Sequence, residues 1–77
     1  MSNKLPEKIE KLFFAFKKAI EAEKEAQAFY LQTKKLCDDD VLKQVFEGFY
    51  QDEMRHEREL INRYDNLRQE FDIEDER

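Results

Sequence analysis

The hexapeptide DEMRHE at residues 52–57 contains the only histidine of the chain, His56, three residues after Glu53. Side chains three residues apart lie on the same face of an α-helix, so these two can meet at one point. A carboxylate and a neutral imidazole form a mixed oxygen and nitrogen ligand set that suits Fe(II), Mn(II) or Zn(II). Glu-x-x-His is a weak motif by itself, because such pairs often arise by chance on exposed helix faces. Its meaning depends on whether that face meets water or a core.

The segment around this motif has the apolar periodicity of a helix, and the motif lies within the apolar stripe. The stripe recurs at steps of three and four residues, at Leu42, Val45, Phe46, Phe49, Glu53, His56, Leu60, Tyr64 and Leu67. An earlier stripe has the same spacing, at Ile9, Leu12, Phe13, Phe16, Ala19, Ile20, Glu23, Ala26, Tyr30 and Thr33. Glu23, Glu53 and His56 interrupt otherwise apolar rows, so we expect all three side chains to point inward.

The stripes predict two long helices with a short turn between them. We expect helix 1 over about residues 6–36, with Pro6 in its first turn, where a missing N–H costs nothing. The sequence CDDD at 37–40 breaks the pattern with short polar side chains that prefer turns and N-caps. Helix 2 follows over about 40–70, and the acidic stretch FDIEDER at 71–77 is expected to fray.

The composition supports an all-α fold and narrows the class of partner. Charged residues make up 43% of the 77 residues, with one Gly and one Pro, as in helix-rich chains. A net charge of −5 argues against nucleic-acid binding, which requires an excess of Lys and Arg. No apolar run approaches the roughly 20 residues that span a bilayer. Cys37 is the only cysteine and has no partner for an internal disulfide. We therefore expect a cytoplasmic protein that binds neither nucleic acid nor membrane.

An antiparallel hairpin would bring the three polar residues to the same level. Glu23 lies about 15 residues before the turn and Glu53 about 15 after it, so they meet roughly 22 Å from the turn. Several carboxylates in a dry core repel one another unless a cation compensates. A single hairpin leaves half of each stripe uncovered, and pairing with a second hairpin into a four-helix bundle would cover it. We expect a homodimer or a larger even-numbered homo-oligomer with a shared metal site.

The two helices also resemble a known family at specific positions. The segments AIEAEKEAQAFYLQTKK and LKQVFEGFYQDEMRHERELI resemble the half-site helices of the ferritin-like superfamily, in particular rubrerythrins and the short encapsulated ferritins. The first-helix motif of that family, a ligand Glu followed seven residues later by Tyr, falls on Glu23 and Tyr30. The second, Glu-x-x-His, falls on Glu53 and His56. The resemblance covers about residues 16–64.

The resemblance implies a di-iron protein that oxidises Fe(II) at an inter-subunit ferroxidase centre for iron storage or detoxification. Glu23, Glu53 and His56 would bind two irons per pair of chains, with Mn or Zn as possible substitutes. Either Glu53 or Glu23 would bridge the irons, and Tyr30 would hydrogen-bond a ligand or donate an electron. An encapsulin-type shell becomes a candidate partner and a protein nanocompartment a candidate location, although FDIEDER contains no shell-targeting peptide that we identify.

Two departures from the family leave alternatives open. A rubrerythrin has two such halves in one chain and usually a rubredoxin-like domain with four cysteines, whereas this chain has one half and one cysteine. Peroxide or O₂ reduction of the rubrerythrin kind would therefore need an external electron donor. The alternative of a different class is a non-catalytic helical interaction module, with Glu and His satisfied by hydrogen bonds or by a structural Zn(II).

Other features near the stripes have simpler interpretations. Glu25, Asp52 and Glu57 border the stripes and are expected to be solvated. Phe14 and the row Ala15, Ala22, Phe29 and Leu36 make helix 1 apolar on more than one face, which favours assembly beyond a dimer. The alternative is a slightly broader dimer interface.

Overall fold

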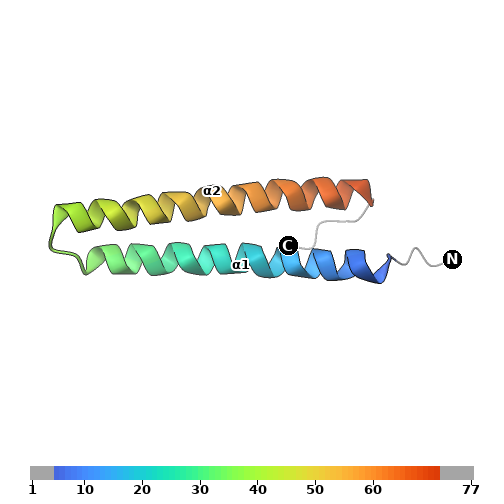
Figure 1. Ribbon diagram of the computed structural model, residues 1–77, viewed down its shortest axis with the longest axis horizontal. Coiled ribbons are helices and arrows are strands. Elements are labelled where there is room, and N and C mark those ends of the chain that lie inside the picture. Colours follow the sequence, from blue (N-terminus) through green and yellow to red (C-terminus); the bar gives the residue numbers. More distant parts are fainter. Residues whose placement is uncertain (1–4, 72–77) are drawn as a thin grey trace.

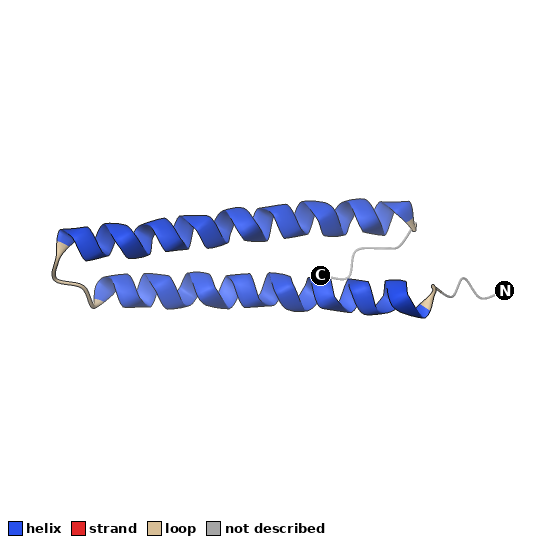
Figure 2. Cartoon of the chain, in the orientation of Figure 1, coloured by secondary structure: helices blue, strands red, loops and turns tan. Residues whose placement is uncertain are grey.

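The chain folds as two long antiparallel helices packed side by side, as the computed structural model shows for residues 5–71 (Figure 1). Helix α1 spans Glu7–Lys35 and helix α2 spans Asp40–Glu70. The described residues form no strand; they consist of the two helices, the turn between them and a few residues at the outer ends (Figure 2). The predicted all-α hairpin is confirmed, whereas the pairing of two hairpins stays a prediction. Most of the predicted acidic tail, residues 72–77, lies outside the described residues.

Helix α1 begins directly after Pro6, whose backbone carbonyl accepts bonds from the amides of Ile9 (3.0 Å) and Glu10 (3.1 Å). Pro6 is thus the N-cap residue, one position before the predicted first turn. Glu7 and Glu10 lie at the positive end of the helix dipole, and Lys34 and Lys35 lie at the negative end. Both ends of α1 therefore have the charges that stabilise a helix.

The turn ends where Asp39 caps α2. The Asp39 side chain accepts a hydrogen bond of 2.9 Å from the amide of Val41, one of the amides that have no partner within the helix. This is the role that short polar side chains of the CDDD sequence were expected to play.

The apolar core is concentrated at the open end of the hairpin. Phe13, Ile20 and Tyr64 are its buried members, and the Phe13 and Tyr64 rings meet edge to face with centroids 5.6 Å apart. Partly buried side chains surround them: Leu5, Ile9, Phe16, Leu60, Ile61, Leu67 and Phe71. A second aromatic cluster lies toward the turn and consists of Phe29, Tyr30, Phe46 and Phe49.

Polar contacts join the helices between and beyond these clusters. The Gln27 amide donates a hydrogen bond of 2.5 Å to Glu57, and Lys34 pairs with Glu47 at 2.9 Å. Many large apolar side chains nevertheless remain exposed: Leu12, Phe14, Phe29, Leu31, Leu36, Val41, Leu42, Val45 and Phe49. No helix in the described part of the chain combines the length and the apolarity of a membrane span.

Candidate metal centre

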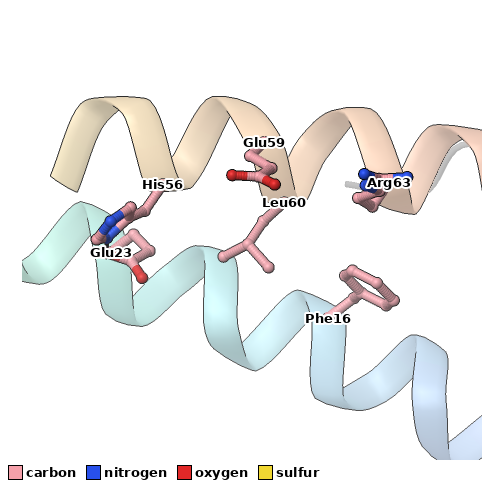
Figure 3. A pocket seen from close by; sticks show the side chains of 6 residues that line it. All are labelled: Phe16, Glu23, His56, Glu59, Leu60 and Arg63. Carbon is pink, nitrogen blue, oxygen red and sulfur yellow. Dashed lines mark ion pairs between the residues drawn. The ribbon is translucent and has the colours of Figure 1, made fainter. Parts of the chain in front are cut away.

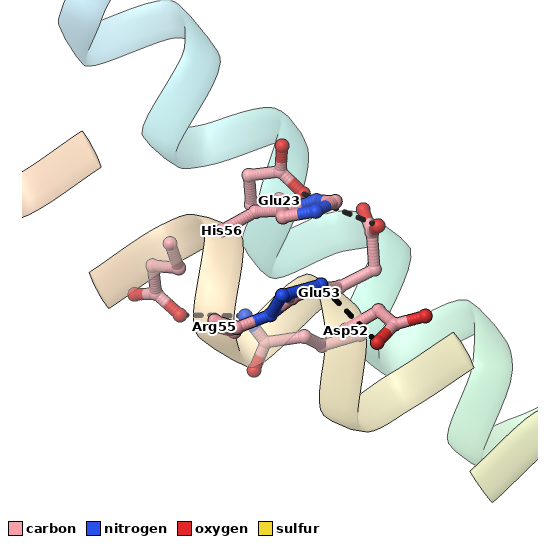
Figure 4. A network of polar contacts seen from close by, with 7 residues as sticks. Glu23, Asp52, Glu53, Arg55 and His56 are labelled. Atoms are coloured by element: carbon pink, nitrogen blue, oxygen red, sulfur yellow. Dashed lines mark hydrogen bonds and ion pairs between the residues drawn. The ribbon is translucent and has the colours of Figure 1, made fainter. Parts of the chain in front are cut away.

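Glu23, Glu53 and His56 lie together where the two helices face each other (Figure 4). By their positions in the sequence they fall between the two clusters, about midway along the hairpin. Glu23 comes from α1, and Glu53 and His56 come from adjacent turns of α2. His56 Nδ1 is 3.3 Å from Oε1 of Glu53 and 3.8 Å from Oε1 of Glu23. One potential ligand atom from each residue lies within 4.8 Å of the others. The antiparallel pairing thus brings together three residues that are separated by up to 33 positions in the sequence.

The three side chains are not enclosed in a core within one hairpin, which corrects the expectation that all point fully inward. The Glu23 and Glu53 side chains are 22% and 21% exposed, whereas that of His56 is 46% exposed. Two helices pack along one line of contact and cannot surround a side chain that lies beside that line. One hairpin therefore encloses the group only in part, with His56 on its open side.

The two carboxylates oppose each other's ionisation. The neighbouring Glu53 carboxyl raises the pKa of Glu23 above its ordinary value, mainly by hydrogen bonding to the protonated form. Burial of Glu23 raises its pKa further, as does electrostatic repulsion from Glu53, and His56 acts in the opposite direction. The metal-free arrangement therefore disfavours a charge on Glu23.

One atom of this group lacks a hydrogen-bond donor within residues 5–71. Oε1 of Glu23 is buried and accepts no hydrogen bond from the part of the chain that the structure describes. Nδ1 of His56 is closer to Glu53 than to Glu23, and one ring nitrogen has at most one N–H to donate, so it cannot fully satisfy both carboxylates. A buried carboxylate oxygen without a donor is unfavourable.

A divalent cation fits this donor set. It would neutralise the repulsion between Glu23 and Glu53, supply the missing partner of Glu23 Oε1 and accept a neutral imidazole nitrogen from His56. These three residues would hold the ion, and a redox-active ion such as iron would supply one-electron chemistry. Partly exposed acidic groups are common in proteins without an ion. The fit of a cation therefore rests on the buried Oε1 of Glu23 that lacks a donor in the described chain, as well as on the residue types.

A groove of about 420 Å³ opens beside the group, on the side toward the open end (Figure 3). Its walls are Phe16, Glu23, His56, Glu59, Leu60 and Arg63. Phe16 and Leu60 provide apolar surface, and Glu59 and Arg63 provide charge at the rim. Sequence reasoning did not identify Glu59 and Arg63, although their spacing of three and seven residues from His56 places them on its side of the helix.

Tyr30 lies apart from the three ligand candidates. Its ring packs against Phe49, with centroids 5.4 Å apart, and against Phe46 at 6.2 Å. Seven residues of helix separate Tyr30 from Glu23, which corresponds to roughly 10 Å along the axis. The structure thus describes Tyr30 as a member of the aromatic cluster, and its role in a reaction stays a prediction.

Two of the three acidic neighbours, Asp52 and Glu57, are engaged in ion pairs or hydrogen bonds of their own, and Glu25 is exposed. Glu57 was expected to be solvated, but its side chain is mostly buried and contacts Gln27 and, at 4.0 Å, Lys24 on α1. That expectation is wrong because Glu57 lies on the edge of α2 that faces α1. Asp52 remains on the surface and pairs with Arg55 at 3.3 Å.

Comparisons of the chain with protein-family models, with curated proteins and with solved structures find no match. The likeness to ferritin-like proteins therefore rests on Glu23, Tyr30, Glu53 and His56 and their spacing.

Proposed function

We propose that this protein oxidises Fe(II) to Fe(III) at a ferritin-like di-iron centre shared by two copies of the chain. The observation that carries the proposal is the convergence of Glu23, Glu53 and His56, with a buried Glu23 oxygen that lacks a hydrogen-bond donor among the described residues. A divalent cation is the partner that satisfies both carboxylates at once.

Charge and exposure support a centre that two copies share. One hairpin supplies two carboxylates and one imidazole, and its His56 faces outward. Two hairpins supply four carboxylates, which balance two divalent cations without net buried charge. Glu53 or Glu23 would bridge the two irons, and His56 would complete the ligand set on each side.

The reaction uses iron as the substrate. Two Fe(II) ions each lose one electron, and this electron pair with two protons reduces O₂ to hydrogen peroxide, leaving two Fe(III) ions as product. Glu23, Glu53 and His56 bind and orient the ions, and Phe16 and Leu60 limit the access of water. Storage of the oxidised iron would require a compartment outside the hairpin, such as a protein shell, and the single cysteine, Cys37, suits a reducing, cytoplasmic setting.

A non-catalytic helical module is the second candidate, and the contact between His56 and Glu53 favours it. Nδ1 of His56 lies 3.3 Å from Oε1 of Glu53, and this contact needs no metal. In that case the group would serve only to align the two helices.

Anaerobic Fe(II) loading followed by addition of O₂ separates the two candidates. The proposed centre predicts rapid formation of Fe(III), which is monitored by its absorbance. The rate of this oxidation should fall by more than about 100-fold for Glu53→Ala. The matched control is Asp52→Ala, which removes the adjacent, exposed carboxylate and is expected to leave the rate unchanged. Circular dichroism checks that both variants remain helical. Full activity of a helical Glu53→Ala protein would overturn the proposed function.

A further inference from the structure

The apolar stripe of α2 is symmetric about the candidate metal centre. Four stripe residues on one side of the point between Met54 and Arg55 have a stripe residue at the same distance on the other side. The pairs are Leu42 with Leu67, Val45 with Tyr64, Phe49 with Leu60, and Glu53 with His56. A two-fold axis through this point, perpendicular to the helix, would place each of these eight residues level with a stripe residue of a second α2. Phe46 is the one member of the stripe that does not match, because its counterpart is Arg63.

Helix α1 has a row of residues with the same symmetry, which overlaps only in part with the apolar stripe described above and runs from Leu12 to Leu36. Residues of this row alternate at steps of three and four and are mostly small, and they pair about Lys24: Leu12 with Leu36, Ala15 with Thr33, Ala19 with Phe29, and Ala22 with Ala26. Lys24 lies next to Glu23, at nearly the same distance from the turn as the centre of the α2 stripe. One axis can therefore relate both helices to their copies, with the small residues closest to it.

The two halves of the hairpin differ in shape in a way that selects an antiparallel partner. On the turn side of the centre, Leu42, Val45 and Phe49 protrude, with exposures of 47%, 41% and 43%. On the open side, Tyr64 is buried, Leu60 is partly buried, and the groove beside His56 is concave. A parallel partner would bring protruding side chains together and leave the grooves empty, whereas an antiparallel partner brings the protruding half of each copy to the concave half of the other.

The size of the face suits a stable dimer. Helices of this length extend about 45 Å, and the hairpin is 17 Å wide. Such a face presents on the order of 800 Å², which is the area that a standard protein–protein interface takes from each partner. The same face contains the open side of the Glu23, Glu53 and His56 group.

We propose that a second copy of this chain docks antiparallel on this face, in the register that places Phe49 of each copy in the groove beside His56 of the other. This inference rests on the proposed function for the identity of the centre, but its geometry does not require iron. The aromatic ring would cover Phe16 and Leu60 and close the open side of the centre. The site is thus incomplete without the partner, which supplies both the second ligand set and a wall.

Distances between spin labels test the direction and the register without iron. In a Cys37→Ser background, single nitroxide labels are attached at exposed positions of α2 through Gln44→Cys, Arg55→Cys or Asn66→Cys. In an antiparallel dimer, the axial separation of identical labels grows by roughly 3 Å for each residue between the label and the axis. Arg55 labels should therefore be closest, and Gln44 and Asn66 labels should each be separated by roughly 30 to 35 Å along the bundle.

Each other pattern overturns the proposal. Equal distances at all three positions would indicate a parallel dimer, and clearly unequal distances at Gln44 and Asn66 would indicate a different register. Absence of any inter-chain distance at micromolar concentration would indicate a monomer. Because the protein is metal-free in this experiment, a correct register with no iron oxidation would refute the proposed function alone.

A pair of Phe substitutions tests the contact itself. Phe49→Ala is expected to raise the dimer dissociation constant about tenfold or more, as for other buried aromatic anchors. Phe14→Ala is the control, since Phe14 is 63% exposed and lies outside both symmetric stripes. Dissociation is measured by analytical ultracentrifugation, with circular dichroism to confirm helicity. Equal effects of the two substitutions would contradict the placement of Phe49 in the groove.

Discussion

The carboxyl group of Glu23 lies between two helices with the Glu53 carboxyl beside it and a raised pKa. Such an arrangement is unfavourable for folding of the metal-free chain at neutral pH, because the ionised form is the one that the site disfavours. The same arrangement is favourable once a cation is bound. Residues that bind at the expense of stability in this way are typical of functional sites.

Glu23→Gln is therefore expected to stabilise the metal-free protein at pH 7. A folded-state pKa raised above the ordinary value of 4.5 means that ionisation of Glu23 costs the folded state free energy above that pH, and that the cost vanishes as pH falls below it. The melting temperature should rise at pH 7, where 1 kcal/mol corresponds to about 4 to 8 °C, and should change little near pH 4. Thermal unfolding at both pH values measures this.

The control for this substitution is Glu21→Gln, which removes an exposed carboxylate that pairs with Lys18 at 3.9 Å on the same helix. Its effect on the melting temperature should be small at both pH values. A Glu23→Gln protein less stable than the unchanged protein at pH 7 would show that the Glu23 charge is already compensated without metal.

At the scale of the helices, the side chain of Asp39 stabilises the first turn of α2. Asp39→Ala is expected to destabilise the folded chain by about 1 kcal/mol, because the amide of Val41 loses its acceptor. Asp38→Ala removes the same charge one residue earlier and serves as the control. Asp39→Asn should retain most of the stability, since an amide oxygen also caps. Chemical denaturation followed by circular dichroism compares the three, and similar losses for Asp38→Ala and Asp39→Ala would exclude the capping bond as the cause.

Local signals in the sequence also explain which parts of the fold could be predicted. The spacing of apolar residues and the CDDD sequence were sufficient to predict two helices and the turn, and the level of Glu23 with Glu53 followed from the antiparallel pairing. The location of the core did not follow. Periodicity gives each stripe residue equal weight, whereas Tyr64 is buried and Phe49 is exposed. That difference depends on how closely the two helices pack at each level.

The exposure of His56 and the mostly buried position of Glu57 were unpredictable for a related reason. Both lie near the line where α2 meets α1, and a rotation of α2 by a few tens of degrees about its axis would exchange which of them faces α1. The sequence pattern does not determine this rotation within one hairpin. In the proposed dimer the outward rotation of His56 is what allows it to serve a site shared by two chains.

At the scale of the whole molecule, the hairpin has few buried residues and a large exposed apolar face. A chain of this size usually needs a partner, a metal or a disulfide for stability. The proposed assembly provides two of these, and they make separable contributions. Dimerisation makes the melting temperature rise with protein concentration, and a bound metal adds RT ln(1 + [L]/Kd), or about 2.7 kcal/mol at a hundredfold excess over Kd.

His56→Ala distinguishes these two contributions. The substitution removes a metal ligand but none of the apolar side chains of the symmetric stripes, so the melting temperature should still rise with protein concentration. The further rise on addition of Zn(II), a redox-inactive probe of the same ligand set, should be lost. Thermal unfolding over a hundredfold range of protein concentration, with and without Zn(II), measures both effects. A His56→Ala protein that gains as much stability from Zn(II) as the unchanged chain would place the metal elsewhere, and a melting temperature independent of concentration in both proteins would argue against the dimer.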